Sequence, residues 1–529
     1  MKNSNIKRRD FLRIATASSL MLPASLSFGQ QGTVDAQTQF GTVRGMRANG
    51  VNVFKGIPYG ASTSGSNRFM PPRNPTPWRE YREAFAYGPA APQSDPASGN
   101  QQDGNESEDC LVLNVWSRGL NDGVRRPVMF WIHGGGFRSL SGSSAGYDGT
   151  NLCLRGDVVV VTINHRLNLL GFTDFGEIDS DFSSSGTVGM QDIVHALKWV
   201  QNNIENFGGD PDRVMIFGES GGGRKVGVVL GMPEAKGLFH AAMIESGATL
   251  RLPEKEAASA LAQRVLEDLG ISPSNLRAIQ EVPLQRLMAA YHSVAATAPE
   301  AGGGAFAPTM DGELIPHHPF WPKASPVNPD VPVIIGANRT EMTLFAGGNE
   351  ALFNLDEAGM RQRVAELVGA ENVNSVVSVY QQANPDASAS EIYFLIWSDQ
   401  SYVMASHTMA ERRAALNAAP VYLYYLAWET PISGGRMMSP HSLDIPFMFD
   451  NTRINRFTAG SETAIALADK VSDTMIHFAR TGDPNVGKLP VWLPYDAQNR
   501  HTMILNNVSA LESDPLQSRR EIMQPILKL

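Results

Sequence analysis

The pentapeptide Gly-Glu-Ser-Gly-Gly at residues 218–222 constrains the fold of this chain more than any other feature. It comes directly after the apolar run 213–217, so the sequence predicts a strand, a tight turn at Ser220 and then a helix. Glycine on either side of such a turn tolerates its strained backbone. The pattern is typical of a nucleophile elbow, in which a serine hydroxyl projects from the sheet edge and the first N–H groups of the helix stabilise an oxyanion.

A glycine-rich phosphate loop is the alternative for the same residues. Such a loop needs a lysine followed by serine or threonine directly after the glycines. No such pair follows here, and Arg224 and Lys225 come too late to replace it. Nucleotide binding is therefore not expected.

Short β-branched runs alternate with helical segments along the chain. This rhythm predicts an α/β fold with a large, mostly parallel sheet covered by helices on both faces. Residues 190–207 place apolar side chains at helical spacing, and 254–300 and 349–419 are expected to be mainly helical insertions that cover the site. The expected strands are 128–132, 157–164, 213–217, 331–335 and 420–428.

Residues 1–29 have the layout of a cleavable export signal. Adjacent arginines, Arg8 and Arg9, precede a weakly apolar stretch and then small residues, which is typical of a twin-arginine signal. A short membrane anchor is the alternative, but the stretch falls short of the roughly 20 apolar residues that a span needs. We therefore predict a bacterial protein exported to the periplasm or secreted, with residues 30–529 forming one domain without a transmembrane segment.

The charge balance and the cysteine content exclude several functions. The formal net charge is −9, so nucleic acid is not an expected partner. Two cysteines, Cys110 and Cys153, are too few to be the main device that holds a fold of 529 residues. His317 and His318 are adjacent and point apart on an extended chain, and no Cys/His cluster accompanies them, so neither a metal nor another cofactor is expected.

A second glycine-rich loop, at residues 133–137, follows the expected strand 128–132. Side chains there would block the approach of an oxyanion, so Gly135 and Gly136, with Gly221 at the elbow, are the expected oxyanion-hole donors. A flexible turn is the alternative. Two such loops in the expected order, each after a strand, are much less probable by chance than one.

A serine nucleophile needs a histidine to take its proton and a carboxylate to orient the imidazole. Both are expected downstream of Ser220, with the acid first. His441 is favoured because it lies in a turn-rich loop after an expected strand, whereas His240 and His477 are interpreted as helix-face residues.

For the acid, Glu341 follows the expected strand 331–335, in a loop of the kind where catalytic residues gather. Asp311 and Asp399 stay as alternatives, because the residue pattern gives Glu341 only a modest lead. A surface carboxylate is the other interpretation of Glu341.

Almost the whole of residues 30–529 resembles the cholinesterase-like type B carboxylesterases, which have the α/β-hydrolase fold. The matching motifs are at 54–59, 68–72, 107–115, 133–137, 164–166, 189–192, 207–211, 218–222, 336–341, 441–447 and 478–485. The resemblance implies a serine esterase that hydrolyses small-molecule carboxylic esters through an acyl-enzyme without a cofactor. It implies the triad Ser220, His441 and Glu341, and it assigns the three oxyanion glycines the same role.

The resemblance also implies two structural ion pairs, Arg68 with Glu108 and Arg166 with Asp192. The family often bridges the cysteine at position 110 to one just before Pro-Gln, but here Ala91 stands there, so that disulfide cannot form. The loop 94–106 lacks the tryptophan with which cholinesterases hold a quaternary ammonium, so choline esters are not expected substrates.

The elbow itself departs from the family pattern. Gly221 replaces the more usual alanine, and Arg224 and Lys225 follow the glycines. One hypothesis is that a cation beside the site favours anionic esters, and the alternative is a solvated or ion-paired helix face. A lipase or amidase of the same fold, or a non-catalytic binding module, are the competing functions, and the complete catalytic set disfavours the binding module.

Overall fold

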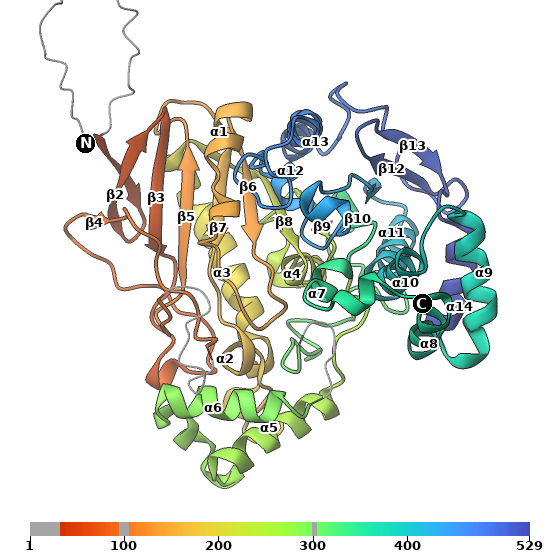
Figure 1. Cartoon of the computed structure of the whole chain (residues 1–529). Helices are drawn as coiled ribbons and strands as arrows, with labels where there is room; N and C mark the ends of the chain where they lie inside the picture. The colour runs from red at the N-terminus through yellow and green to blue at the C-terminus, as the bar shows by residue number, and fades with distance from the viewer. Residues whose placement is uncertain (1–31, 95–104, 299–303) are drawn as a thin grey trace, which may run out of the picture.

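The computed structural model describes residues 32–94, 105–298 and 304–529, which form one continuous thirteen-stranded sheet with helices on both faces (Figure 1). The sheet order is β1-β2-β3-β5-β7-β6-β8-β9-β10-β11-β12-β13, with β4 beside β2. From β7 to β12 all neighbours are parallel, and the strands at either end pair antiparallel except for β4, which pairs β2 in parallel. The predicted mostly parallel sheet is confirmed.

The strands are β1 Gly32–Thr38, β2 Gly41–Ala48, β3 Val51–Pro58, β4 Arg82–Glu83, β5 Val112–Ser117, β6 Arg126–Ile132, β7 Val159–Ile163, β8 Gly209–Glu219, β9 Ala241–Glu245, β10 Val333–Asn338, β11 Val421–Leu426, β12 His501–Leu505 and β13 Ala510–Ser513. All five predicted strands are present, with ends that differ by a few residues. The predictions missed β9, the N-terminal strands and the final hairpin.

The helices are α1 Thr150–Gly156, α2 Asn168–Phe172, α3 Val188–Asn203, α4 Gly221–Val229, α5 Lys255–Leu269, α6 Leu284–Ala295, α7 Thr343–Ala346, α8 Glu357–Val368, α9 Val373–Ala383, α10 Ala389–Ser398, α11 Met404–Ala414, α12 Ile445–Met448, α13 Glu462–Thr481 and α14 Gln517–Leu527. None of the helices in the described part of the chain is long and apolar enough to cross a membrane.

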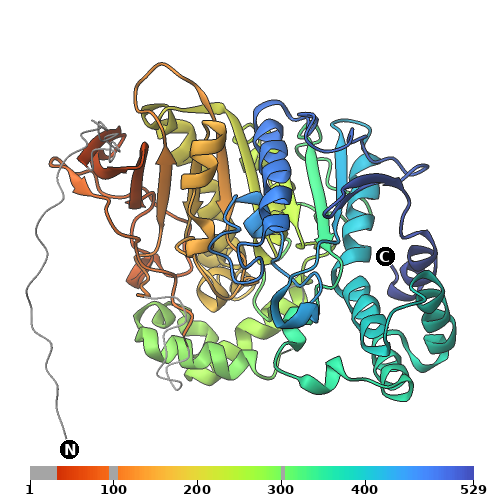
Figure 2. The same cartoon turned by 45° about the horizontal axis from the view of Figure 1, so that its top comes forward.

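Side chains that alternate along the central strands build two cores, one on each face of the sheet. On β6, Val128 and Phe130 point into the core that includes α3, α4, α5 and α6, whereas Met129 and Trp131 point into the core that includes α1 and α13. Figure 2 shows α13 lying across its face of the sheet. Burial on both faces explains why these strands read as nearly continuous apolar runs.

The predicted insertion at 254–300 is α5 and α6, which lie beyond one end of the central strands (Figure 1). The predicted insertion at 349–419 is correct for α8, α9 and α10, which pack around a third core. It is wrong at its end, because Met409 and Ala410 of α11 belong to the core on the sheet. An amphipathic helix buries its apolar face against whatever surface is near, and local sequence does not distinguish a sheet from neighbouring helices.

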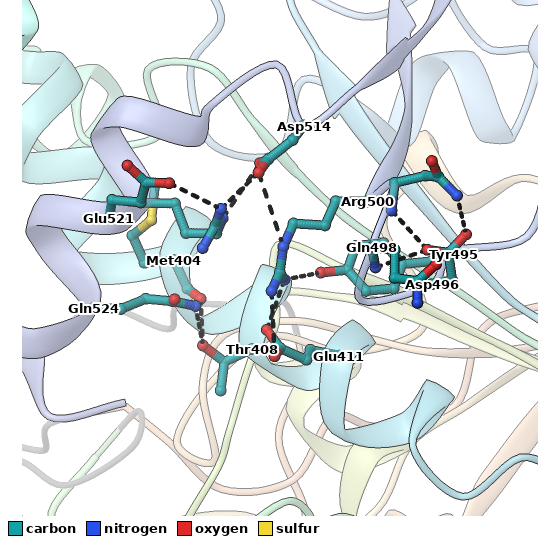
Figure 3. Close-up of polar contacts among 12 residues, drawn as sticks. Met404, Thr408, Glu411, Tyr495, Asp496, Gln498, Arg500, Asp514, Glu521 and Gln524 are labelled. Carbon is teal, nitrogen blue, oxygen red and sulfur yellow. Dashed lines mark hydrogen bonds and ion pairs between the residues drawn. The ribbon is translucent and has the colours of Figure 1, made fainter.

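Polar contacts fasten the C-terminal helix α14 to the body of the protein (Figure 3). Arg500, just before β12, donates 2.7 Å hydrogen bonds to Glu411 of α11 and to the hydroxyl of Tyr495. Gln524 of α14 donates to the hydroxyl of Thr408 at 3.2 Å. The Gln524 contact joins α14 to α11, and the Arg500 contact joins α11 to the segment before β12.

Candidate active site

Ser220 occupies the sharp turn between β8 and α4, as the sequence predicts. Its backbone has φ 56° and ψ −120°, a region that costs a residue other than glycine about 1–3 kcal/mol. The Ser220 amide donates to the Glu245 carbonyl of β9 at 2.8 Å, which anchors the turn to the neighbouring strand. A Cβ on Gly222 would lie 2.0 Å from the carbonyl oxygen of Ile132, so only glycine lets α4 approach β6 this closely.

The loop after β6 lies directly against the elbow. A Cβ on Gly221 would lie 2.2 Å from the carbonyl oxygen of Gly136 and 2.4 Å from its nitrogen, which explains why this chain has glycine where alanine is more usual. Within the described residues, the amides of Gly135 and Gly136 donate no hydrogen bond to the protein. The Gly221 amide belongs to the first turn of α4, whose N–H groups lack intrahelical acceptors.

His441 and Glu341 form a buried pair. Nδ1 of His441 lies 2.5 Å from Oε2 of Glu341, and the His441 amide donates to the Glu341 carbonyl at 3.1 Å. The other carboxylate oxygen of Glu341 accepts 2.6 Å hydrogen bonds from the hydroxyl of Ser246 and the amide of Asn338. Both oxygens of Glu341 thus have hydrogen-bond partners, which hold the carboxylate in place and orient the imidazole ring.

The two alternative acids have other partners. Asp399 is buried, and its two oxygens accept hydrogen bonds from Arg519 at 2.8 and 2.6 Å. Asp311 accepts from the amides of Glu313 and Ile315 in its own loop. Neither acid contacts His441 in the described residues.

His477 and His240, both interpreted as helix-face residues, lie in different kinds of segment. His477 lies on α13, as expected, but the helix-face interpretation of His240 is wrong. His240 immediately precedes β9, and its Nδ1 accepts a hydrogen bond from the Val214 amide of the neighbouring β8.

A carboxyl group that sequence reasoning did not single out lies on the other side of the imidazole. Oε1 of Glu219 is 3.2 Å from Nε2 of His441 and accepts a 2.7 Å hydrogen bond from the Ser442 hydroxyl. Burial raises the pKa of Glu219 to about 8. Burial disfavours a charged ring at His441, but the carboxyls of Glu219 and Glu341 and the Tyr402 hydroxyl outweigh it, so the pKa of His441 lies well above its ordinary value.

Two further buried acids, Asp444 and Glu245, lie near Glu341 and Glu219. Asp444 accepts a 2.8 Å hydrogen bond from the Tyr424 hydroxyl, and burial, with Glu341 nearby, raises its pKa to about 6. Burial also raises the pKa of Glu245 well above its ordinary value. A signal was present in the sequence, because Glu219 precedes Ser220 by one residue and Asp444 follows His441 by three.

Most of the predicted catalytic residues line one cavity of about 430 Å³. It is lined by Gly135, Gly136, Arg138, Ser139, Leu140, Tyr147, Glu219, Ser220, Arg224, Leu344, Phe345, Tyr402, His441 and Ser442. Tyr402 reaches it from a π-helical turn, Asp399–Val403, that the Asp399–Arg519 ion pair anchors. The structure therefore brings Ser220, His441 and two of the three predicted oxyanion glycines to one cavity, with Glu341 behind the histidine.

The two cations after the elbow have separate positions. Lys225 is completely buried, and its Nζ donates a 3.0 Å hydrogen bond to the His133 carbonyl at the start of the glycine loop. Burial lowers the pKa of Lys225 to about 7. The hypothesis that Lys225 forms a solvated helix face, or contacts an anionic substrate, is wrong; Arg224 is the cation of this pair that lines the cavity.

The two expected ion pairs are present and buried. Arg68 donates to Glu108 at 2.6 and 2.8 Å, and Arg166 donates to Asp192 at 2.9 and 2.7 Å. Breaking one side of such a pair typically costs about 3–5 kcal/mol, so these pairs hold the segments around the site. The two cysteines are buried and free.

Comparisons with known proteins agree on one family. The model of the carboxylesterase family matches residues 31–521. The chain is 33% identical over 494 residues to the para-nitrobenzyl esterase of Bacillus subtilis, which covers 92% of this chain and 98% of that protein.

Solved structures give the same result. The carboxylesterase EST55 of Geobacillus stearothermophilus matches with a TM-score of 0.80 and 36% identity, over 92% of this chain and 99% of that one. An esterase of Clostridium hathewayi, described as able to hydrolyse aliphatic aromatic polyesters, matches with a TM-score of 0.80 and 31% identity, over 94% of this chain and 100% of that one.

Proposed function

Because this chain belongs to the carboxylesterase family, has the α/β-hydrolase fold and is a serine carboxylesterase, we propose that Ser220, His441 and Glu341 are its catalytic triad. The observation that carries the proposal is the 2.5 Å contact between Nδ1 of His441 and Glu341, in an imidazole that lines the same cavity as Ser220. Glu341 then holds the proton on Nδ1, so the lone pair on Nε2, which lies beside Glu219, acts as the base.

The reaction proceeds through an acyl-enzyme. Nε2 of His441 takes the proton from the Ser220 hydroxyl as its oxygen attacks the acyl carbon, and the resulting imidazolium protonates the departing alcohol. Water, activated by the same nitrogen, then releases the acid. The amides of Gly135, Gly136 and Gly221 donate to the tetrahedral oxyanion at each stage. Because they donate to no acceptor in the described part of the chain, no hydrogen bond seen there is broken when the oxyanion forms.

The test of the nucleophile is the Ser220→Ala variant with matched controls. We expect kcat for a 4-nitrophenyl ester to fall roughly a million-fold, and an exposed serine, Ser66, supplies the control Ser66→Ala. A panel with esters of increasing chain length, aromatic esters and anilides separates an esterase from a lipase or an amidase. Full activity in purified Ser220→Ala would refute the mechanism.

We also propose that residues 1–29 are a twin-arginine signal and that residues 30–529 form the single exported domain. The signal lies outside the described residues, and the paired arginines support it. In a bacterial host, replacing Arg8 and Arg9 with lysine should move esterase activity from the periplasmic to the cytoplasmic fraction. Equal fractions for the two proteins would contradict export by this route.

A further inference from the structure

Arg224 is the most distinctive charged group in the active-site cavity. It lies in the first turn of α4, four residues after Ser220, and is half-buried. Within the described residues, no carboxylate lies within ion-pair distance of its guanidinium, and its one contact with a charged or aromatic group is with the Tyr402 ring, 6.0 Å away. A guanidinium that lines a cavity without a carboxylate at ion-pair distance can bind the carboxylate of a ligand.

The carboxyl group that shares the cavity does not compensate this charge. Glu219 accepts its hydrogen bond from Ser442 and lies beside the imidazole of His441. The charge of Glu219 acts on His441, whose pKa it raises, and no ion pair joins it to Arg224 within the described residues. Arg224 therefore places a guanidinium at the wall of the cavity in a chain whose net charge is −9.

Two aromatic rings lie near His441, and one of them, that of Tyr402, also lies near Arg224. The ring of Tyr402 lies 4.8 Å from that of His441, and the ring of Phe345 lies 5.1 Å from it, measured between centroids. Phe345 is 55% exposed, which is unusual for so large an apolar side chain beside a catalytic centre. A substrate that packs against the Tyr402 ring would therefore have the His441 imidazole at one end and the Arg224 guanidinium at the other.

We infer that this esterase prefers aromatic esters that carry a free carboxylate, such as monoesters of aromatic dicarboxylic acids, and that Arg224 binds that carboxylate. The inference rests on the proposed catalytic role of Ser220. A guanidinium matches a carboxylate with two parallel hydrogen bonds, which adds both affinity and orientation. The ring of the substrate packs against Tyr402 and Phe345, and its ester group lies at Ser220.

Two substrates of the same shape test this directly: the monomethyl ester of terephthalic acid, which is anionic, and methyl 4-carbamoylbenzoate, which is neutral. The readout is the ratio of their kcat/KM values, measured by product chromatography. We expect the wild type to favour the anion, and Arg224→Gln to lower the ratio on the order of tenfold, mainly through KM. Arg224→Lys should retain part of the preference, and added salt should weaken it.

The control is Arg79→Gln, which removes the same charge at an exposed residue that does not line the cavity. It should leave the ratio of the two kcat/KM values unchanged. Equal ratios in the wild type and Arg224→Gln, or no preference for the anion in the wild type, would overturn the inference. Ser220→Ala separates the two proposals. If that variant is inactive while the ratio is flat, the triad stands and the anionic substrate class is refuted; if it stays active, the catalytic assignment itself fails.

Discussion

Lys225→Met should make the protein more stable and less active. In the folded protein, burial lowers the pKa of Lys225 from 10.5 to about 7. At roughly 1.4 kcal/mol for each pKa unit, keeping this lysine buried costs about 5 kcal/mol at pH 7. Methionine has a similar length and no charge. Losing the hydrogen bond leaves the buried His133 carbonyl without its donor, which costs about 1–3 kcal/mol, so the net gain is roughly 2–4 kcal/mol.

The stability difference between Lys225→Met and the wild type depends on pH. Between pH 7 and 10.5 the unfolded chain holds a proton on residue 225 that the folded protein has released, so the stability of the wild type rises with pH across this window. The advantage of Lys225→Met is therefore largest at pH 7 and below, and it disappears above pH 10.5.

Urea denaturation of both proteins at pH 7 and pH 10 measures the effect, with Lys236→Met at an exposed position as the control. Activity should fall several-fold, because the freed His133 carbonyl begins the loop that carries Gly135 and Gly136. The reasoning is refuted if Lys225→Met is less stable than the wild type at pH 7, or if the difference is the same at both pH values.

Three further changes test other parts of the site. Gly221→Ala places a methyl group against Gly136, so kcat should fall on the order of tenfold to a hundredfold with KM little changed; an unchanged kcat would contradict the close approach. Glu219→Gln removes a carboxyl that raises the pKa of His441, so the acidic limb of the kcat/KM profile should move to lower pH, and an unmoved limb would count against that electrostatic role. Asp192→Asn unpairs the buried Arg166 and should cost roughly 3–5 kcal/mol of unfolding free energy, whereas a loss below 1 kcal/mol by denaturation would show that the pair is dispensable.

The central strands were predictable because both of their faces are buried. β7 is Val-Val-Val-Thr-Ile and β6 is also wholly buried, so β-branched and aromatic residues run continuously in the sequence. β9, Ala-Ala-Met-Ile-Glu, was missed because alanine has little strand preference, although the strand is fully buried. β1 and β2 expose several residues to solvent and gave a weaker signal, whereas β5 is buried throughout and was still missed.

The site was predictable where local chemistry decides its shape. Ser220, Gly135 and Gly136 follow strands directly, and the loop that holds His441 is rich in turn residues, so short-range patterns placed them. Choosing Glu341 over other acids needed the family resemblance, because its contact with His441 joins segments 100 residues apart.

Lys225 was misjudged because two adjacent charges suggest a solvated surface. The helical spacing of Lys225 relative to buried residues of α4 indicated an inward position. Lys225 lies four residues after Gly221 and four before Val229, both of which are buried, so it shares the inward face of α4. Burial of an individual charged side chain depends on that face and on the carbonyl it meets, which local composition does not reveal.

Covalent labelling with a fluorophosphonate tests the central claim most directly, namely that His441 and Glu341 activate Ser220. Intact mass spectrometry and peptide mapping of the treated protein should find one adduct per chain, on Ser220. The labelling rate should fall by several orders of magnitude in His441→Ala and by less in Glu341→Gln. An adduct on another residue, or labelling of Ser220 that is equally fast in His441→Ala, would contradict the account.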